Sequence, residues 1–180
     1  MESPLSSTAY VILGMICEEP RSGYEIKAMV DGTTRFFWAA SYGQIYPELK
    51  RLAEIGLVVG SDAPTGGRRR TVYEITEDGA EELKAWLRKP PETYELREEG
   101  LLKLFFAGVL EPSEAVEIVR SMRAHRLAAN AELRQMQPMA AGHEDKYPLM
   151  VLESGLEFTE WFADWCERTE KRILALGEKG

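Results

Sequence analysis

Two consecutive prolines, Pro90 and Pro91, constrain the fold of this 180-residue chain more than any other feature. Proline has no amide donor, and the residue before it is held away from helical backbone geometry. A helix that runs toward Lys89 must therefore end there. The sequence accordingly predicts two domains, one over residues 1–89 and one over residues 90–180.

The first half carries the start signals of four helices. Apolar residues at helical spacing predict a first helix close to the N-terminus. Ser22 with Glu25, and Ser41 with Gln44, each have the spacing of a capping box, so a second and a third helix should begin there. Thr76 precedes two acidic residues and is expected to cap a fourth helix.

Because of Pro47, the sequence is compatible with two starting positions for the third helix. If Ser41 is the cap, Pro47 lies in the second turn, where it removes one backbone hydrogen bond and should bend the helix. Alternatively, the regular helix begins only at Tyr46, which puts Pro47 at its favoured first position. In both cases the helix is expected to continue to about Ile55.

Two short strands are predicted after the third helix, at residues 57–59 and 71–75. Pro64, Gly66 and Gly67 signal a turn between them, and three arginines follow the turn. The predicted fold is therefore mostly α with a small β hairpin: a winged helix-turn-helix domain followed by a helical dimerisation domain. In winged helices the third helix enters the major groove of DNA, and the hairpin lies along the backbone.

The net charge of −8 argues at first against nucleic acid as a partner. Its distribution matters more than its sum. Residues 1–90 hold 11 Lys and Arg against 13 Asp and Glu, a net charge of −2, whereas residues 91–180 hold 11 against 17, a net charge of −6. The acidity therefore lies mainly in the second half, and double-stranded DNA stays a plausible partner of the first.

The candidate DNA contacts are the polar, basic and tyrosine side chains that the expected core does not use. Glutamine can read adenine, tyrosine and serine can bond phosphates, and cations can neutralise them. The alternative interpretation places Tyr46 in the core and treats the basic residues as solvated surface, with Ser41 mainly a cap. The candidates are Tyr24, Lys27, Ser41, Tyr42, Gln44, Tyr46, Lys50, Arg51, Arg68, Arg69 and Arg70.

The second half is predicted to form three helices, over residues 97–109, 112–137 and 149–176, with a loop at residues 138–148. Apolar side chains recur every seven residues along the middle helix, as in a coiled-coil seam. Helices this apolar need a partner surface, and a homodimer supplies one. The candidate dimerisation residues are Ala115, Ile118, Met122, Ala129, Leu133, Met136, Trp161, Phe162 and Trp165.

The sequence gives little support for metal binding, catalysis or a cofactor. Trp161 and Trp165 lie one turn apart and could line a site for an aromatic small-molecule effector, although packing is the commoner use of such a pair. Neither cysteine nor histidine spacing fits a metal site, no catalytic motif is present, and no cofactor is expected. No apolar run is long enough to span a membrane and the N-terminus does not resemble a signal peptide, so a cytoplasmic location is expected.

The chain resembles the PadR family of transcriptional regulators, in the branch with the longer helical C-terminal domain. The resemblance rests on a long collinear set of segments, strongest up to about Gly108. They are residues 13–14 (LG), 22–26 (SGYEI), 43–52 (GQIYPELKRL), 54–58 (EIGLV), 73–79 (YEITEDG), 86–87 (WL), 90–91 (PP), 97 (R) and 101–106 (LLKLFF). The resemblance implies dimerisation through the C-terminal helices, and repression of transcription that in some members responds to phenolic or other small molecules.

The sequence therefore predicts a DNA-binding regulator, a repressor that acts as a homodimer on a near-palindromic operator. Two alternatives stay open. The winged helix could serve as a protein–protein interaction module, or the protein could be an activator or architectural DNA binder of the same fold.

Overall fold

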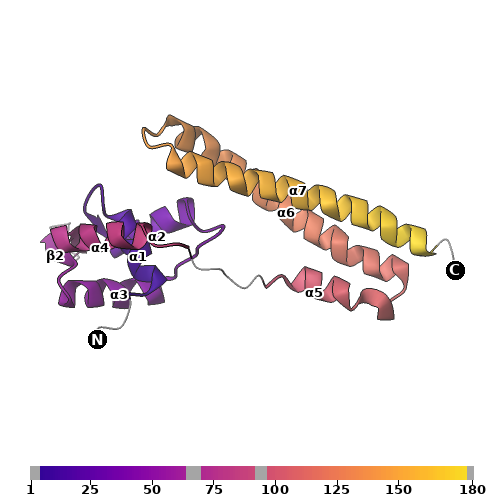
Figure 1. Cartoon of the computed structure of the whole chain (residues 1–180), viewed down its shortest axis with the longest axis horizontal. Helices are drawn as coiled ribbons and strands as arrows, with labels where there is room; N and C mark the ends of the chain where they lie inside the picture. Colours follow the sequence, from indigo (N-terminus) through magenta and orange to yellow (C-terminus); the bar gives the residue numbers. More distant parts are fainter. Residues whose placement is uncertain (1–4, 64–69, 92–96, 178–180) are drawn as a thin grey trace. The chain divides into compact units, whose positions relative to one another are not determined.

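The computed structural model describes residues 5–63, 70–91 and 97–177 (Figure 1). The chain forms two compact units, Met1–Thr93 and Tyr94–Gly180. Each unit has its own hydrophobic core.

The N-terminal unit is a winged helix. Its helices pack around one core, and its strands form an antiparallel sheet in the order β1-β3-β2. The elements are α1 (Ser7–Met15), β1 (Arg21–Ser22), α2 (Gly23–Gly32), α3 (Tyr42–Glu54), β2 (Val58–Ala63), β3 (Arg70–Ile75) and α4 (Glu77–Leu87). The predicted winged-helix fold is confirmed.

One strand was not predicted. β1 has two residues, of which Arg21 pairs with Tyr73 and Ser22 with Val72 of β3. A two-residue strand has no periodicity of its own, so it is recognised only when its partner strand lies beside it. Its consequence is that the start of α2 is tied to the wing hairpin.

The core of this unit follows the predicted apolar faces of the helices. Ile12 on α1, Ile26 on α2 and Leu49 on α3 are completely buried. Burial of one such side chain contributes roughly 1.5–3 kcal/mol. On the far side, the ring of Tyr10 stacks on Trp86 at 4.5 Å between centroids, which holds α4 against α1.

The structure decides between the two predicted starts of α3. The helix begins at Tyr42 with Ser41 as its N-cap, and Pro47 lies inside it. Pro47 cannot donate to the carbonyl of Gly43, four residues earlier. Gly43 is exposed, so water can satisfy that carbonyl and the helix tolerates the proline.

Thr76 joins the end of α3 to the start of α4. Its hydroxyl accepts from the amide of Gly79 at 3.0 Å and donates to the carbonyl of Gly56 at 2.9 Å. A Cβ atom at position 79 would lie 2.1 Å from the carbonyl oxygen of Leu57. Only glycine permits this close approach between α4 and the chain that leads into β2.

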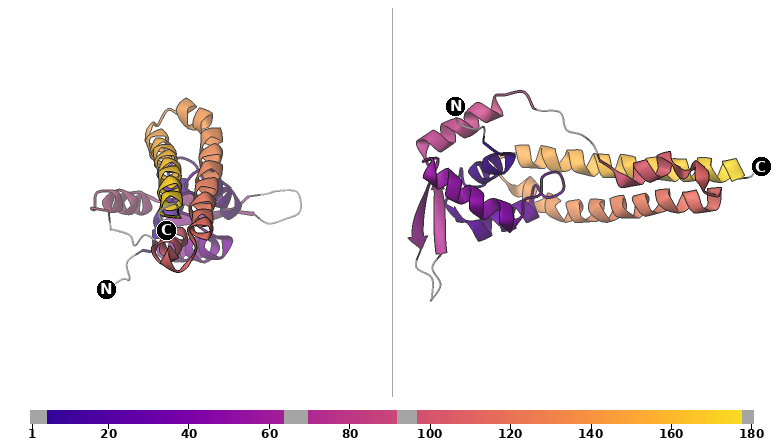
Figure 2. Two further views of the ribbon diagram at one scale, coloured as in Figure 1. Left: turned by 90° about the vertical axis from the view of Figure 1, so that its right-hand side faces the viewer. Right: turned by 90° about the horizontal axis from the view of Figure 1, so that it is seen from below.

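The C-terminal unit is a long helical hairpin with a short helix beside it. α6 and α7 lie side by side and antiparallel, and α5 packs on α6 (Figures 1 and 2). The elements are α5 (Glu99–Phe105), the 3-10 helix η1 (Ala107–Val109), α6 (Pro112–Gly142) and α7 (Tyr147–Gly177).

The loop predicted at residues 138–148 is wrong. α6 continues through Pro138 to Gly142, and only residues 143–146 connect it to α7. The reason is tertiary. Met136 and Ala140 pack against a cluster of Leu133, Leu152 and Leu156, so burial on both sides of Pro138 offsets the backbone hydrogen bond that it removes.

A buried polar side chain sets the register of the two long helices. The amide of Asn130 on α6 donates to the Thr159 hydroxyl at 2.8 Å and to the Leu156 carbonyl at 3.3 Å. Its oxygen accepts from Arg134 at 2.9 Å. A shift of either helix would leave these buried groups without partners, which is costly.

Candidate nucleic-acid interface

Three tyrosines from α2 and α3 form a row on the surface of the N-terminal unit. The rings of Tyr24 and Tyr42 lie 6.5 Å apart at 18°, and those of Tyr42 and Tyr46 lie 6.1 Å apart at 22°. All three are exposed, by 66%, 44% and 49%. Large exposed aromatic side chains with hydroxyl tips suit a contact with sugar, phosphate or base edges.

Tyr46 holds this row against the first residue of α2. A Cβ atom at Gly23 would lie 2.7 Å from the Tyr46 Cε1 atom and 3.2 Å from the Leu49 Cδ1 atom. The ring therefore lies directly on the glycine backbone while about half of its surface faces solvent. The interpretation of Tyr46 as a core residue is thus wrong.

Ser41 and Gln44 bond to each other in the structure. The Ser41 amide and hydroxyl both donate to the Gln44 side-chain oxygen, at 2.9 and 3.0 Å. Recognition of adenine by glutamine uses its oxygen as an acceptor and its nitrogen as a donor. Both lone pairs of this oxygen are engaged, so Gln44 presents only its NH₂ group unless the cap opens.

The three basic side chains on α2 and α3 differ in their exposure and in their ion pairs. Lys27 is 15% exposed, pairs with Asp31, and its Nζ lies 5.5 Å from the centre of the Tyr42 ring. Arg51 pairs with Glu48 at 2.9 Å. Lys50 is 80% exposed and lies 3.7 Å from Glu54, a loose contact. Lys50 is therefore the most available of the three for a phosphate.

Of the three wing arginines, Arg68 and Arg69 lie outside the described residues. Arg70 is the first residue of β3, and its guanidinium pairs with Glu25 of α2. The same Glu25 carboxylate accepts from the Ser22 amide at 2.9 Å and the Ser22 hydroxyl at 3.0 Å. Arg70 thus has a partner within the protein, which its place in a basic run did not indicate.

The ion pair changes the electrostatics of Glu25. The Arg70 guanidinium, followed by the hydrogen bond from the Ser22 amide, lowers the pKa of the Glu25 carboxyl from 4.5 to about 2. The carboxylate is therefore charged at physiological pH.

Sequence reasoning missed Glu25 and Gly23 as parts of this surface. The sequence predicts for Glu25 only a role in the helix cap, which the structure confirms. Nothing local predicted its contact with Arg70, because the two residues meet only through the pairing of β1 with β3.

The structure places most predicted dimerisation residues inside the C-terminal unit itself. Ala115, Met122 and Phe162 are buried in one core cluster with Ile118 and Trp165 packed against it. Leu133 is buried in a second cluster, with Met136 at its edge. Ala129 is half-buried, and Trp161 is 56% exposed. Except for Ala129 and Trp161, these side chains pack in the clusters that join α6 to α7 and α5.

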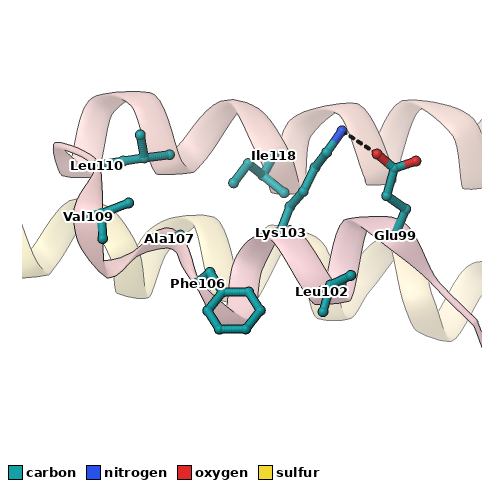
Figure 3. Close-up of a pocket in the computed structure, with 8 residues that line it drawn as sticks. All are labelled: Glu99, Leu102, Lys103, Phe106, Ala107, Val109, Leu110 and Ile118. Carbon is teal, nitrogen blue, oxygen red and sulfur yellow. Dashed lines mark ion pairs between the residues drawn. The ribbon is translucent and has the colours of Figure 1, made fainter.

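A different apolar surface is exposed on α5 and η1. Its members are large apolar side chains that stand in solvent, namely Leu102, Phe105, Phe106, Val109 and Leu110. All of them except Phe105 line an open pocket of about 570 Å³, which is also lined by Lys103 and Glu99, an ion pair at 2.8 Å (Figure 3). Ile118 of α6 also lines the pocket, whereas Trp161 and Trp165 do not.

Among the residues that the structure describes, no group of three or more His, Cys, Asp or Glu side chains could hold a metal ion. Likewise, none of the helices described here combines the length and apolarity that a bilayer requires.

The fold and this surface define the class of protein: a winged-helix transcriptional regulator with a helical C-terminal unit. Residues 12–85 match the family model of the PadR-like transcriptional regulators. A second model, described as the C-terminal domain of a virulence activator, matches residues 96–173.

Relatives are similar over nearly the whole chain. The negative transcriptional regulator PadR of Bacillus subtilis is 29% identical over 94% of this chain and 97% of its own. The crystal structure of that protein with operator DNA superposes with a TM-score of 0.86 at 29% identity, covering 95% of this chain and 99% of the other. Its structure with p-coumaric acid gives a TM-score of 0.78 at 26% identity, covering 96% and 98%.

Proposed function

We propose that this protein is a DNA-binding transcriptional repressor that acts as a homodimer on a near-palindromic operator. The observation that carries the proposal is the full-length similarity to a negative regulator that has been crystallised on operator DNA. The exposed tyrosine row and Lys50 on α3 supply side chains suited to that role. Because its relatives are transcriptional regulators, we propose neither a catalytic activity nor a cofactor.

In this proposal α3 is the recognition helix. Tyr24, Tyr42, Tyr46, Lys50 and the donor group of Gln44 face the DNA, and Ser41 mainly caps the helix. Lys27 and Arg51 act through their neighbours and contact the backbone less directly, because each already has an acidic partner. Arg68 and Arg69 stay predicted phosphate contacts.

The C-terminal unit is proposed to form the dimer. Its exposed surfaces, the apolar side chains on α5 and η1 together with Trp161 on α7, are the regions available to a second copy. The buried seam residues support dimerisation indirectly, because they shape the helical hairpin that carries these surfaces. A two-fold dimer would place two recognition helices about 34 Å apart, one turn of DNA.

An aromatic small molecule is proposed as the effector, since a structure of the B. subtilis relative contains p-coumaric acid. The pocket beside α5 is a candidate site by its apolar lining. Action on chromosomal DNA implies a cytoplasmic location.

A second candidate function is activation of transcription. The specific observation in its favour is the match of residues 96–173 to a virulence-activator domain. The same DNA-binding surface would serve either role, so DNA binding alone does not distinguish them.

The test is a titration of the purified protein with a fluorescent duplex from the upstream region of its own gene, against random duplex at about 150 mM salt. Specific binding at least ~1,000-fold tighter than binding to random DNA is expected. Equal affinity for both duplexes would reject sequence-specific regulation and favour a protein–protein module. A reporter gene placed downstream of the same region distinguishes repression from activation. If the protein is a repressor, deletion of its gene should raise expression of the reporter.

A further inference from the structure

Glu25 lies at a junction of three elements of the winged helix. One carboxylate oxygen accepts from the Ser22 amide and hydroxyl at the end of β1, and the other pairs with Arg70 at the start of β3. The ring of Tyr46 on α3 packs against the backbone of Gly23, two residues before Glu25. The wing strand, the start of α2 and the recognition helix therefore meet within one turn of α2.

The environment of Arg70 favours a role inside the protein. Its Nε atom is buried and has no hydrogen-bond acceptor in the described part of the chain, and its side chain is 38% exposed. A guanidinium that reached for phosphate would be expected to project into solvent, as the Lys50 side chain does at 80% exposure. Arg70 instead pairs with Glu25 of α2.

We propose that Glu25 and Arg70 are a positioning pair, which fixes the wing strand relative to α2 and α3 in the geometry that binds DNA. The inference rests on the proposed DNA-binding function. It differs from the sequence prediction, in which Arg70 contacts phosphate directly. It further implies that Glu25, although acidic and close to the DNA-binding surface, strengthens DNA binding.

The two roles of Arg70 predict opposite effects of one substitution. Glu25→Gln removes a negative charge next to the DNA-binding surface and keeps an oxygen that can accept from Ser22. If Arg70 contacts phosphate, the variant frees its guanidinium and reduces repulsion, so DNA binds more tightly. If the pair positions the wing, the variant binds DNA more weakly although the protein has become less acidic.

The experiment measures the dissociation constant of the full-length dimer for its own upstream duplex, and the dependence of this constant on salt. Measurements are made well below the midpoint of thermal unfolding of each variant. Glu25→Gln and Arg70→Gln should each weaken binding about fivefold per protomer, the factor for a partly exposed ion pair. The double variant should be no weaker than either single variant, because both remove the same interaction.

The salt dependence separates positioning from direct contact. For a positioning pair, the slope of log K against log salt stays that of the wild type in all three variants. A loss of slope of about one contact per protomer in Arg70→Gln would assign Arg70 to phosphate and overturn the proposal. Tighter binding by Glu25→Gln would overturn it as well. So would a lower unfolding temperature with unchanged affinity, because the pair would then be only structural.

Glu74→Gln is the matched control. Glu74 is exposed on the same strand as Arg70, and no ion pair to it occurs among the described side chains. The substitution removes the same charge without touching the junction, so affinity should stay unchanged or rise slightly. Failure of the wild type to bind any duplex specifically would instead reject the proposed function, which is a distinguishable outcome.

Discussion

The ring of Tyr46 lies on the backbone of Gly23, so close that a Cβ atom there would stand 2.7 Å from the ring. This contact couples the first residue of α2 to the middle of α3. Through the neighbouring ring of Tyr42, it sets the orientation of the whole exposed tyrosine row. The absence of a side chain at Gly23 thus allows α3 to hold its exposed tyrosines in this arrangement.

Gly23→Ala should therefore weaken DNA binding by about tenfold or more and destabilise the fold by ~1 kcal/mol, although alanine usually stabilises a helix relative to glycine. The Tyr46 ring has to move to admit the methyl group. Gly32→Ala, at the other end of α2 with nothing within 4 Å of the added atom, is the control and should be neutral or stabilising. Duplex titration and thermal unfolding of both variants check this; equal behaviour of the two would contradict it.

Lys50→Ala should weaken binding to all duplexes and reduce the salt slope by about one contact per protomer, because this exposed cation is the freest on α3. The matched control is Lys84→Ala on α4, which removes an exposed lysine that is paired with Glu81. Its affinity and slope should equal those of the wild type. An unchanged slope in Lys50→Ala would remove Lys50 from the interface.

Gln44→Glu should separate helix capping from DNA binding. Glutamate keeps the acceptor that bonds the Ser41 amide, and its charge suits a helix N-terminus, so thermal stability is expected to hold or rise. DNA affinity should fall by about tenfold, since a carboxylate would face phosphates. Full affinity in this variant would show that Gln44 lies away from the DNA.

The Glu25 carboxyl predicts a specific acid dependence of stability. Its pKa is about 2 in the folded protein against 4.5 when unperturbed. A lowered pKa stabilises the fold above the unfolded value, and that contribution is lost as the pH falls from about 4.5 toward 2. Both partners are more than a third exposed, so the contribution is at most about 1 kcal/mol.

Chemical unfolding of the wild type and Glu25→Gln between pH 7 and pH 2.5 measures this contribution. The difference in unfolding free energy should be largest at neutral pH and shrink below pH 4.5. A difference that stays constant over this range would indicate that the ion pair contributes nothing.

Phe105→Ser should weaken the dimer without unfolding the C-terminal unit, because this side chain is 81% exposed in one chain. Phe162→Ala is the contrasting variant. It truncates a buried ring and should cost about 3–5 kcal/mol of stability. Sedimentation over a range of concentrations, with thermal unfolding, distinguishes the two effects. A dimer as tight as the wild type in Phe105→Ser would exclude this face of α5 from the interface.

Predictions from local signals were the accurate ones. The capping boxes at Ser22 and Ser41 and the cap at Thr76 lie where the sequence predicts them. Such signals depend on contacts within about four residues, which the order of residues already contains. The predicted end of α6 before Pro138 was wrong, because packing against α7 outweighs the local effect of the proline.

The sequence identifies the basic and aromatic residues of the candidate interface but not how exposed or how strongly paired each one is. Lys27, Lys50 and Arg70 carry the same charge, and only their neighbours in space distinguish them. The apolar seam of α6 was likewise recognised, while its partner proved to be α7 of the same chain. Periodicity shows that a face is buried and does not identify what buries it.

By itself, the sequence indicated two parts, the winged helix and the resemblance to the PadR-like family, since each depends on local residue patterns. The tertiary structure alone decided that Arg70 faces Glu25, that Tyr46 lies on Gly23, and that the α5 surface is left exposed. The physical reason is distance along the chain. Glu25 and Arg70 are 45 positions apart, and a contact of that separation exists only after β1 has paired with β3.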